Sequence, residues 1–298
     1  MRKGVERGIE TTGKEFMKTV AVIGLGLMGG SLGMALRQKG LARVKGYARR
    51  VETRQQALDM GAVDEACETP GEAVKGAAIV VLCTPVLTIP ALVNECLGAS
   101  KAGAVITDVG STKSEVVNRV APILTGHKVH FVGSHPMAGS EKSGIEAARA
   151  DLYEGAVTAV TPSRGESDKV VKAVIDLWAG IGSRVIRISP EEHDALVART
   201  SHLPHLIASL LVTATVKEGD ANFRALCGPG FRDTTRIAGG SPDMWHDIVK
   251  TNRVAILEAL KGCQGQMGEL ISALEIGDFE AVREQLEQGR RLRRGLWS

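Results

Sequence analysis

The sequence predicts an α/β protein, in which a doubly wound parallel sheet is followed by an all-helical domain. Two observations carry this prediction. The first two-thirds of the 298 residues alternate short β-branched runs with helical patterns, which is typical of a parallel sheet with helices on both faces. After Pro190 no strand-like run returns, and the apolar residues follow helical spacing instead.

Seven runs have the length and composition of buried strands. They are Thr19–Ile23, Arg43–Tyr47, Ile79–Cys83, Val105–Thr107, Val129–Val132, Ala156–Val160 and Arg184–Ile188. Helices are expected between them, at Gly29–Lys39, Arg50–Met60, Leu87–Leu97, Thr112–Leu124 and Ser167–Ala179. The last two strand runs should extend the sheet.

Three long helical segments are expected in the last third: Glu191–Val216, Met244–Leu274 and Asp278–Leu292. Long apolar faces on a domain of this size often need a second chain to cover them, so we expect a homodimer through this half. The predicted organisation is a flexible extension over 1–17, a dinucleotide-binding domain over 18–189 and a helical substrate and dimerisation domain over 190–298.

Composition excludes several classes of protein. The net charge is +3, hydrophobic residues make up 44% and charged residues 24%, as in ordinary globular proteins. Lys and Arg are spread along the chain apart from a short C-terminal cluster, which argues against nucleic-acid binding. The five cysteines form no CxxC pair, so a reducing cytoplasm is expected. The charged N-terminus is no signal peptide, and the uncharged stretches are interrupted by Gly or Pro, so no membrane span is predicted.

The strongest local motif is a glycine-rich turn, G-x-G-x-x-G, that follows the first strand and opens a helix. In this context the motif is the fingerprint of a Rossmann-like dinucleotide-binding domain. The helix N-terminus would supply free N–H groups for the cofactor phosphates. The expected cofactor-binding residues of this turn are Gly24, Leu25, Gly26, Leu27, Met28 and Gly29.

Cofactor choice is expected to depend on the end of the second strand, which reads Ala48-Arg49-Arg50. An enzyme that uses NAD usually has an acidic residue here for the ribose 2′-hydroxyl. Two guanidinium groups suit a 2′-phosphate instead, so NADP is favoured and NAD remains possible. The alternative is a solvated basic loop.

Three further strand ends lie in the predicted crevice. Thr84 and Pro85 follow the third of the longer strands, where a nicotinamide ribose would lie. Ser111 follows the next strand, and it either faces the ligand or, with Thr112, caps the following helix. His135 comes at the end of the next strand, between Ser and Pro, where it is poorly placed as core filler and well placed to accept a proton.

The helical half adds two clusters of polar residues. Ser201-His202-Leu203-Pro204-His205 has two histidines one helical turn apart. A metal site is one interpretation, but no third ligand follows at a suitable spacing, and no metal is expected. Arg232 and Arg236 flank Asp233, which suggests either a surface ion pair or a pair of cations for a substrate carboxylate.

Taken together and in this order, these blocks resemble the prephenate/arogenate dehydrogenase family of tyrosine biosynthesis. The motifs are GLGLMGGS, LCTP, TDVGSTK, GSHPMAGSEKSG, SHLPH and GFRDTTRIA, and the likeness runs from Val20 to about Leu292. The resemblance implies oxidation of a cyclohexadienyl carboxylate with NAD(P)+ and loss of CO2. Prephenate would give 4-hydroxyphenylpyruvate, and arogenate would give tyrosine.

The resemblance also implies roles for residues. His135 would accept the proton of the substrate hydroxyl, and Ser111 would orient that contact. Arg236 would bind a substrate carboxylate, with Arg232 and Lys142 as further candidate cations. Ser201, His202 and His205 would line the substrate side of the crevice.

Two other functions are compatible with a Rossmann domain followed by helices. One is a β-hydroxyacid dehydrogenase, although that class resembles this chain less because it uses a catalytic lysine where SHLPH stands. The other is a nucleotide sensor without activity, which the set of His135, Ser111 and Arg236 disfavours.

Overall fold

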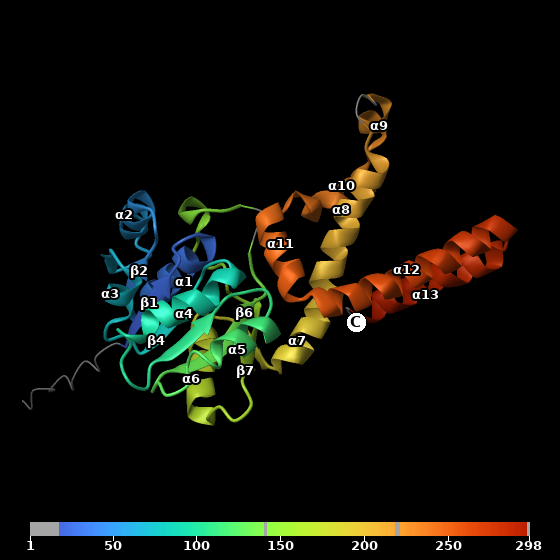
Figure 1. Cartoon of the computed structure of the whole chain (residues 1–298). Coiled ribbons are helices and arrows are strands. Elements are labelled where there is room, and N and C mark those ends of the chain that lie inside the picture. The colour runs from blue at the N-terminus through green and yellow to red at the C-terminus, as the bar shows by residue number, and fades with distance from the viewer. Residues whose placement is uncertain (1–17, 140–141, 218–220, 297–298) are drawn as a thin grey trace, which may run out of the picture. The chain divides into compact units, whose positions relative to one another are not determined.

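The computed structural model describes residues 18–139, 142–217 and 221–296. The predicted extension over 1–17 lies outside these ranges. The chain divides into two compact units, residues 1–190 and 191–298, and each is described by itself (Figure 1).

Unit 1 is built around one eight-stranded sheet with the order β3-β2-β1-β4-β5-β6-β7-β8. The chain changes direction between β1 and β4, which makes this point the topological switch of a doubly wound sheet. The strands are β1 (Thr19–Ile23), β2 (Arg43–Tyr47), β3 (Glu65–Cys67), β4 (Ile79–Leu82), β5 (Val105–Asp108), β6 (His130–Pro136), β7 (Val157–Pro162) and β8 (Arg184–Arg187).

Helices cover both faces of this sheet (Figure 1). Alternate residues of the buried strands point to opposite faces, so two apolar clusters form. Val20 and Val22 pack on the face covered by α1, α2 and α6, whereas Ala21 and Ile23 pack on the face covered by α3, α4 and α5. The helices are α1 (Leu27–Gln38), α2 (Val51–Asp59), α3 (Pro70–Val74), α4 (Ile89–Leu97), α5 (Ser114–Val120) and α6 (Asp168–Gly180).

The α/β prediction is confirmed, with two differences. The short β3 and α3 were not predicted, because runs of three and five residues are too brief for a periodic pattern. In addition, β7 pairs antiparallel to β6, while all other neighbours are parallel. A parallel pair needs a crossover connection, usually a helix, and between β6 and β7 the described chain has only the 3-10 turn Ile145–Ala147.

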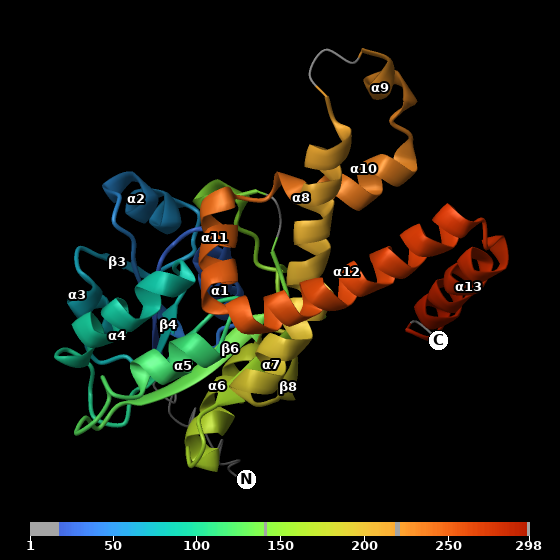
Figure 2. The ribbon, with the colours of Figure 1, turned by 45° about the vertical axis from the view of Figure 1, so that its right-hand side comes forward.

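Among the described residues, unit 2 contains helices and the loops that connect them, and no strands. Its helices are α7 (Pro190–Val197), α8 (Leu203–Thr215), α9 (Ala221–Leu226), α10 (Pro229–Thr235), α11 (Pro242–Thr251), α12 (Arg253–Ile276) and α13 (Phe279–Gly295). Figure 2 shows α12 and α13 side by side as a hairpin, joined by a left-handed Gly277.

Two of the three predicted long helices are interrupted. Between α7 and α8 the chain forms a π-helical segment, Ala198–His202. Pro204 cannot donate a backbone hydrogen bond, which disfavours regular α-helical pairing at this point. Between α11 and α12 the backbone leaves helical geometry at Asn252, with φ −123° and ψ 30°.

The run Pro190–Thr215 is long and apolar enough to cross a membrane by length and composition alone. It also carries four buried polar side chains, which is typical of a core helix in a folded domain rather than of a lipid-facing one. Those side chains are His193, Asp194, His202 and His205.

Candidate active site

The glycine turn connects β1 to α1 and brings three strand ends together. The N–H of Gly24 donates to the carbonyl of Tyr47, at the end of β2, over 2.8 Å. Gly24 has φ +101°, and a Cβ atom there would lie 2.5 Å from the carbonyl oxygen of Cys83, after β4. Only glycine therefore allows this close approach.

The two other glycines of the motif differ in their surroundings. A Cβ atom on Gly29 would overlap the carbonyl oxygen of Gly24, so Gly29 is required by packing, whereas Gly26 faces open space. Gly26 is also the N-cap of α1, and no side chain caps this helix. An open backbone at an uncapped helix N-terminus fits the pyrophosphate of a dinucleotide.

Ala48, Arg49 and Arg50 form the loop between β2 and α2. Ala48 is buried, and both arginines are exposed. A third arginine, which no sequence motif marks, supports this loop: Arg54 donates to the carbonyls of Ala48 and Arg49 at 2.8 and 3.3 Å. Neither Arg49 nor Arg50 has a side-chain partner among the described residues, so both are available to an anion.

Thr84 and Pro85 directly follow β4. Thr84 Oγ1 lies 2.9 Å from Thr88 Oγ1, and Pro85 precedes the short turn that leads into α4. Burial raises the pKa of the neighbouring Cys83 thiol. This agrees with its interpretation as a small apolar residue rather than a nucleophile.

A buried ion pair connects the ends of β5 and β6. The ammonium group of Lys113 contacts Asp108 Oδ2 and donates to the carbonyl of Ser134 at 2.9 Å. Both charged side chains are fully buried. Asp108 also accepts from the backbone N–H groups of Ser134 at 3.1 Å and Gly110 at 2.9 Å.

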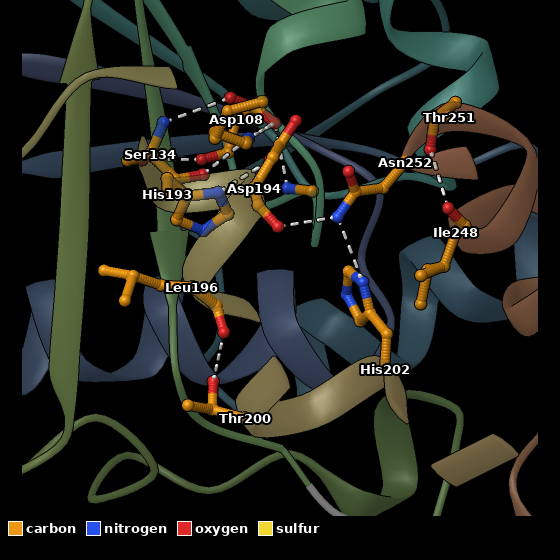
Figure 3. Close-up of polar contacts among 12 residues, drawn as sticks. Asp108, Ser134, His193, Asp194, Leu196, Thr200, His202, Ile248, Thr251 and Asn252 are labelled. Carbon is orange, nitrogen blue, oxygen red and sulfur yellow. Dashed lines mark hydrogen bonds and ion pairs between the residues drawn. The ribbon is translucent and has the colours of Figure 1, made fainter. Parts of the chain in front are cut away.

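The hydroxyl of Ser134 completes this network. It donates to the carbonyl of Asp108 at 2.6 Å and accepts from Trp178 Nε1 at 2.9 Å. Figure 3 shows Asp108 and Ser134 in contact. The residue directly before His135 is thus held by its backbone and its side chain.

Ser111 and His135 lie at the ends of two neighbouring strands of the sheet. His135 is the second-last residue of β6, and Ser111 lies in the loop after β5, the parallel neighbour of β6. The carboxyl ends of β1, β4, β5 and β6 share one edge. The N-cap of α5 is Lys113, whose side chain makes no capping hydrogen bond, so Ser111 and Thr112 stand before the cap position.

The segment between β6 and β7 supports the start of α1. The buried hydroxyl of Tyr153 donates to the carbonyl of Met28 at 2.7 Å, and Ser31 Oγ accepts from the N–H of Arg149 at 2.9 Å. Ile145 lies so close to Gly30 that a Cβ atom there would overlap it. These contacts could not be predicted from local sequence patterns, because the partners are more than one hundred positions apart in the chain.

In unit 2, His202 belongs to a buried polar network (Figure 3). Asn252 Nδ2 lies 2.9 Å from the carbonyl oxygen of Asp194 and 3.2 Å from His202 Nδ1. Burial lowers the pKa of His202 to about 4, against the opposing effect of the Asp194 carboxylate. Ser201 precedes it in the π-helical segment.

His205 lies against an aromatic side chain that belongs to none of the sequence motifs. Its ring stacks on Trp245 with centroids 3.5 Å apart, and His202 meets the same indole edge-on at 6.0 Å. Gly240 packs against both rings: a Cβ atom there would lie 2.7 Å from Trp245 Nε1. Burial lowers the pKa of His205 as well.

Arg232 and Arg236 are exposed, on α10 and on the 3-10 turn Arg236–Gly239 that follows it. Neither arginine forms an ion pair with Asp233 in the described part of the chain, which argues against the surface ion pair. The turn packs on α8, and it ends beside Gly240, at His205. Arg236 thus belongs to the same region of unit 2 as the two histidines.

Among the described residues no group of three or more His, Cys, Asp or Glu side chains is arranged to hold a metal ion. His202 and His205 instead have Asn252 and Trp245 as their neighbours.

Comparison with known proteins identifies the family. The family model for the prephenate dehydrogenase nucleotide-binding domain matches residues 32–187, and that for the prephenate dehydrogenase dimerization domain matches residues 189–288. The chain is 34% identical to the prephenate dehydrogenase of Bacillus subtilis (strain 168) over 282 residues, which cover 93% of this chain and 76% of the relative.

Two crystal structures are similar along nearly the whole chain. Prephenate dehydrogenase from A. aeolicus, in complex with hydroxyphenyl propionate and NAD+, matches with a TM-score of 0.86 and 32% identity, over 94% of this chain and 98% of that one. Synechocystis arogenate dehydrogenase matches with a TM-score of 0.81 and 28% identity, over 93% and 99%. With both family models, these matches show that the chain belongs to the prephenate dehydrogenase family of NAD(P)-dependent oxidoreductases.

Proposed function

We propose that this chain catalyses the oxidative decarboxylation of prephenate or arogenate, giving 4-hydroxyphenylpyruvate or tyrosine, in tyrosine biosynthesis. The observation that carries the proposal is the position of His135. It follows the rigidly held Ser134, at the sheet edge where the glycine turn also ends, in a chain of this family.

His135 acts as the general base. Oxidation of a carbon that carries a hydroxyl group requires removal of the hydroxyl proton, and imidazole is a suitable base near neutral pH. Ser111, on the adjacent loop, orients the hydroxyl toward His135. The nicotinamide, when bound, accepts the hydride. Loss of CO2 makes the ring aromatic, so no dedicated acid is required for that step.

Residues of unit 2 bind the substrate. Arg236 pairs with a substrate carboxylate through its planar guanidinium group, and Arg232 supplies a second cation. Ser201, His202 and His205 contribute hydrogen-bonding groups. Support comes from the packing of the Arg236 turn on α8 and of Gly240 on His205.

NADP is the favoured cofactor. Ala48 offers no carboxylate to a ribose 2′-hydroxyl, while Arg49 and Arg50 are exposed beside it and Arg54 supports the loop. Charge-assisted hydrogen bonds contribute about 1.5–3 kcal/mol each. We therefore expect kcat/KM to be roughly 10- to 150-fold higher with NADP+ than with NAD+ per bond formed.

Exchanging Ala48 tests this preference. Ala48→Asp should shift it toward NAD+, because the carboxylate accepts from the 2′-hydroxyl and repels the 2′-phosphate. Ala66→Asp, at a half-buried position of β3, is a matched control for the added charge. Equal kcat/KM values for the two cofactors in the unaltered protein would contradict the proposal.

The chain is also proposed to act as a cytoplasmic homodimer. The hairpin of α12 and α13 exposes large apolar residues that a second copy would cover. They are Val254, Leu257, Met267, Ile271, Leu274, Ile276, Phe279, Leu286 and Leu292. Light scattering after size exclusion should give twice the mass of one chain. Ile271→Asp places a charge on the exposed apolar face and should lower the measured mass toward that of one chain.

A direct assay tests the activity. The purified protein is mixed with prephenate or arogenate and with NADP+ or NAD+, and absorbance of the reduced nicotinamide is followed. We expect a signal with at least one pair. No signal with any of the four pairs would overturn the proposed function and favour a β-hydroxyacid dehydrogenase or a nucleotide sensor.

A further inference from the structure

The side-chain amide of Asn252 has one orientation that its neighbours permit. Its Nδ2 atom lies 2.9 Å from the carbonyl oxygen of Asp194, which can only accept a hydrogen bond. Turning the amide over would place two oxygens against each other in a buried site. The atom facing Asp194 is therefore the nitrogen, by the logic of the hydrogen-bond network.

This orientation determines the tautomer of His202. The same Nδ2 atom lies 3.2 Å from His202 Nδ1, and its second hydrogen points to that ring nitrogen. Nδ1 must accept, so it carries no proton, and the proton of the neutral ring is on Nε2. A protonated ring would place two donors against each other, so Asn252 also disfavours the imidazolium form.

The backbone of Asn252 is fixed by hydrogen bonds on both sides, so its side chain stays next to His202. Asn252 is buried and lies between α11 and α12. Its N–H donates to the carbonyl of Ile248 at 3.0 Å, and its own carbonyl accepts from the N–H of Ile256 at 3.1 Å. With the backbone fixed on both sides, the side chain joins α7, the π-helical segment and the α11–α12 junction at one point (Figure 3).

The other ring nitrogen of His202 is available. Nε2 has no hydrogen-bond partner within the described ranges. It is not completely buried either, because Thr161 Oγ1 is the only completely buried polar side-chain atom without a partner among the described residues. The ring therefore presents an N–H group that no atom of the described residues uses.

We propose that Asn252 is a positioning residue that holds His202 in the neutral Nε2–H tautomer, so that His202 meets the substrate as an uncharged hydrogen-bond donor. The identity of the substrate in this inference rests on the proposed function. The tautomer of His202 rests only on contacts within unit 2. The low pKa of His202, about 4, agrees with it. The titratable groups that act on His202 are Asp194, which favours protonation, and His193 and His205, which oppose it.

The first test needs no substrate and no variant at position 252. The protein is labelled with 15N-histidine, and the His202 signals among the seven histidines are assigned by their loss in His202→Gln. We expect the Nε2–H tautomer, with no protonation from pH 8 down to about pH 5. An Nδ1–H tautomer, or titration near 6.5, would overturn the proposal even if the enzyme assay succeeded.

The second test reverses the chemistry at position 252. Asn252→Asp replaces the donor by an acceptor, so in the neutral ring the proton should move to Nδ1 and leave Nε2 without a hydrogen to donate. We expect KM for the substrate to increase about 10- to 150-fold, as for one lost hydrogen bond to a charged group, with a smaller change in kcat. Asn118→Asp, exposed on α5, is the matched control.

A third variant separates the hydrogen bond from the added charge. Asn252→Leu is similar in shape and uncharged, so both tautomers should appear in the 15N spectrum, with a smaller increase in KM. If either variant lowers only the melting temperature and leaves KM and the tautomer unchanged, Asn252 is structural and the proposal is wrong. If neither variant folds, the spectrum of the unaltered protein decides.

Discussion

The two units hold their candidate site residues with different buried polar groups. In unit 1 a fully buried ion pair, Asp108 with Lys113, fixes the backbone before His135. In unit 2 a neutral amide, Asn252, contacts a neutral imidazole, His202, and the buried pair of His193 and Asp194 lies next to them. A buried charge pair is strongly destabilised by the loss of one partner, whereas the contact between Asn252 and His202 is sensitive to protonation of the imidazole. We therefore expect the stability of unit 1 to depend on both partners of its ion pair, and the stability of unit 2 to depend on pH.

The largest effect is expected at His135 in unit 1. His135→Asn should lower turnover about 10²–10⁴-fold, the usual contribution of a positioned general base, with a far smaller change in KM. Steady-state kinetics measure both. Near-normal turnover in this variant would move the role to His202 or His205, and the proton-accepting group would then belong to unit 2.

Breaking the ion pair should destabilise unit 1. Lys113→Met leaves Asp108 charged and buried without its partner, which typically costs about 3–5 kcal/mol. Thermal or urea unfolding measures the loss. The control is Lys172→Met, whose partner Asp176 is exposed with it, and a surface pair contributes at most about 1 kcal/mol. Equal effects of the two variants would contradict the role given to the buried pair.

Acid should destabilise unit 2 through His202. Its pKa is about 4 in the folded protein, against an ordinary value of 6.5 for a solvated histidine. Above pH 6.5 the ring is neutral in both states. Between pH 6.5 and about 4 the unfolded chain binds a proton that the folded chain excludes, so the free energy of unfolding falls as the pH falls, by at most about 3 kcal/mol. Below pH 4 both states are protonated.

Variants isolate this contribution from other acid-sensitive groups. His202→Gln should flatten the dependence of unfolding on pH in this window, whereas His127→Gln, at an exposed position, should leave it unchanged. The same dependence in both variants would show that His202 is not kept neutral.

A smaller effect is expected at Arg236. Arg236→Lys retains the charge and loses the planar pair of donors, so the substrate KM should rise about 10- to 150-fold, as for one charge-assisted bond. Arg224→Lys, exposed on α9, provides the matched exchange. An unchanged KM would indicate that Arg232 or Lys142, and not Arg236, binds the substrate carboxylate.

The same comparison explains what the sequence predicts well. The pattern Thr19–Ile23 followed by glycines specifies a buried strand, a tight turn and a helix start through local rules, and all three are confirmed. The antiparallel direction of β7 is not encoded in its apolar residues, because a buried strand has the same composition in either direction.

The polar networks could not be predicted from local patterns. Lys113 stands in the TDVGSTK motif, but nothing in its neighbours indicates that its ammonium group is buried against Asp108. Asn252 interrupts a helical apolar pattern, which is a signal in itself, yet its partners lie 58 and 50 residues away. The roles given to His135, Ser111 and Arg236 stay predictions until the variants are measured.

The stacking of Trp245 on His205 has a spectroscopic consequence. The chain contains three tryptophans: Trp178 is buried in the core of unit 1, Trp245 adjoins both histidines of unit 2, and Trp297 lies outside the described residues. Replacing Trp297 by Phe would leave one indole in each unit. Emission from Trp245 would then report events at the histidines of unit 2, while Trp178 would serve as an internal reference in the same molecule.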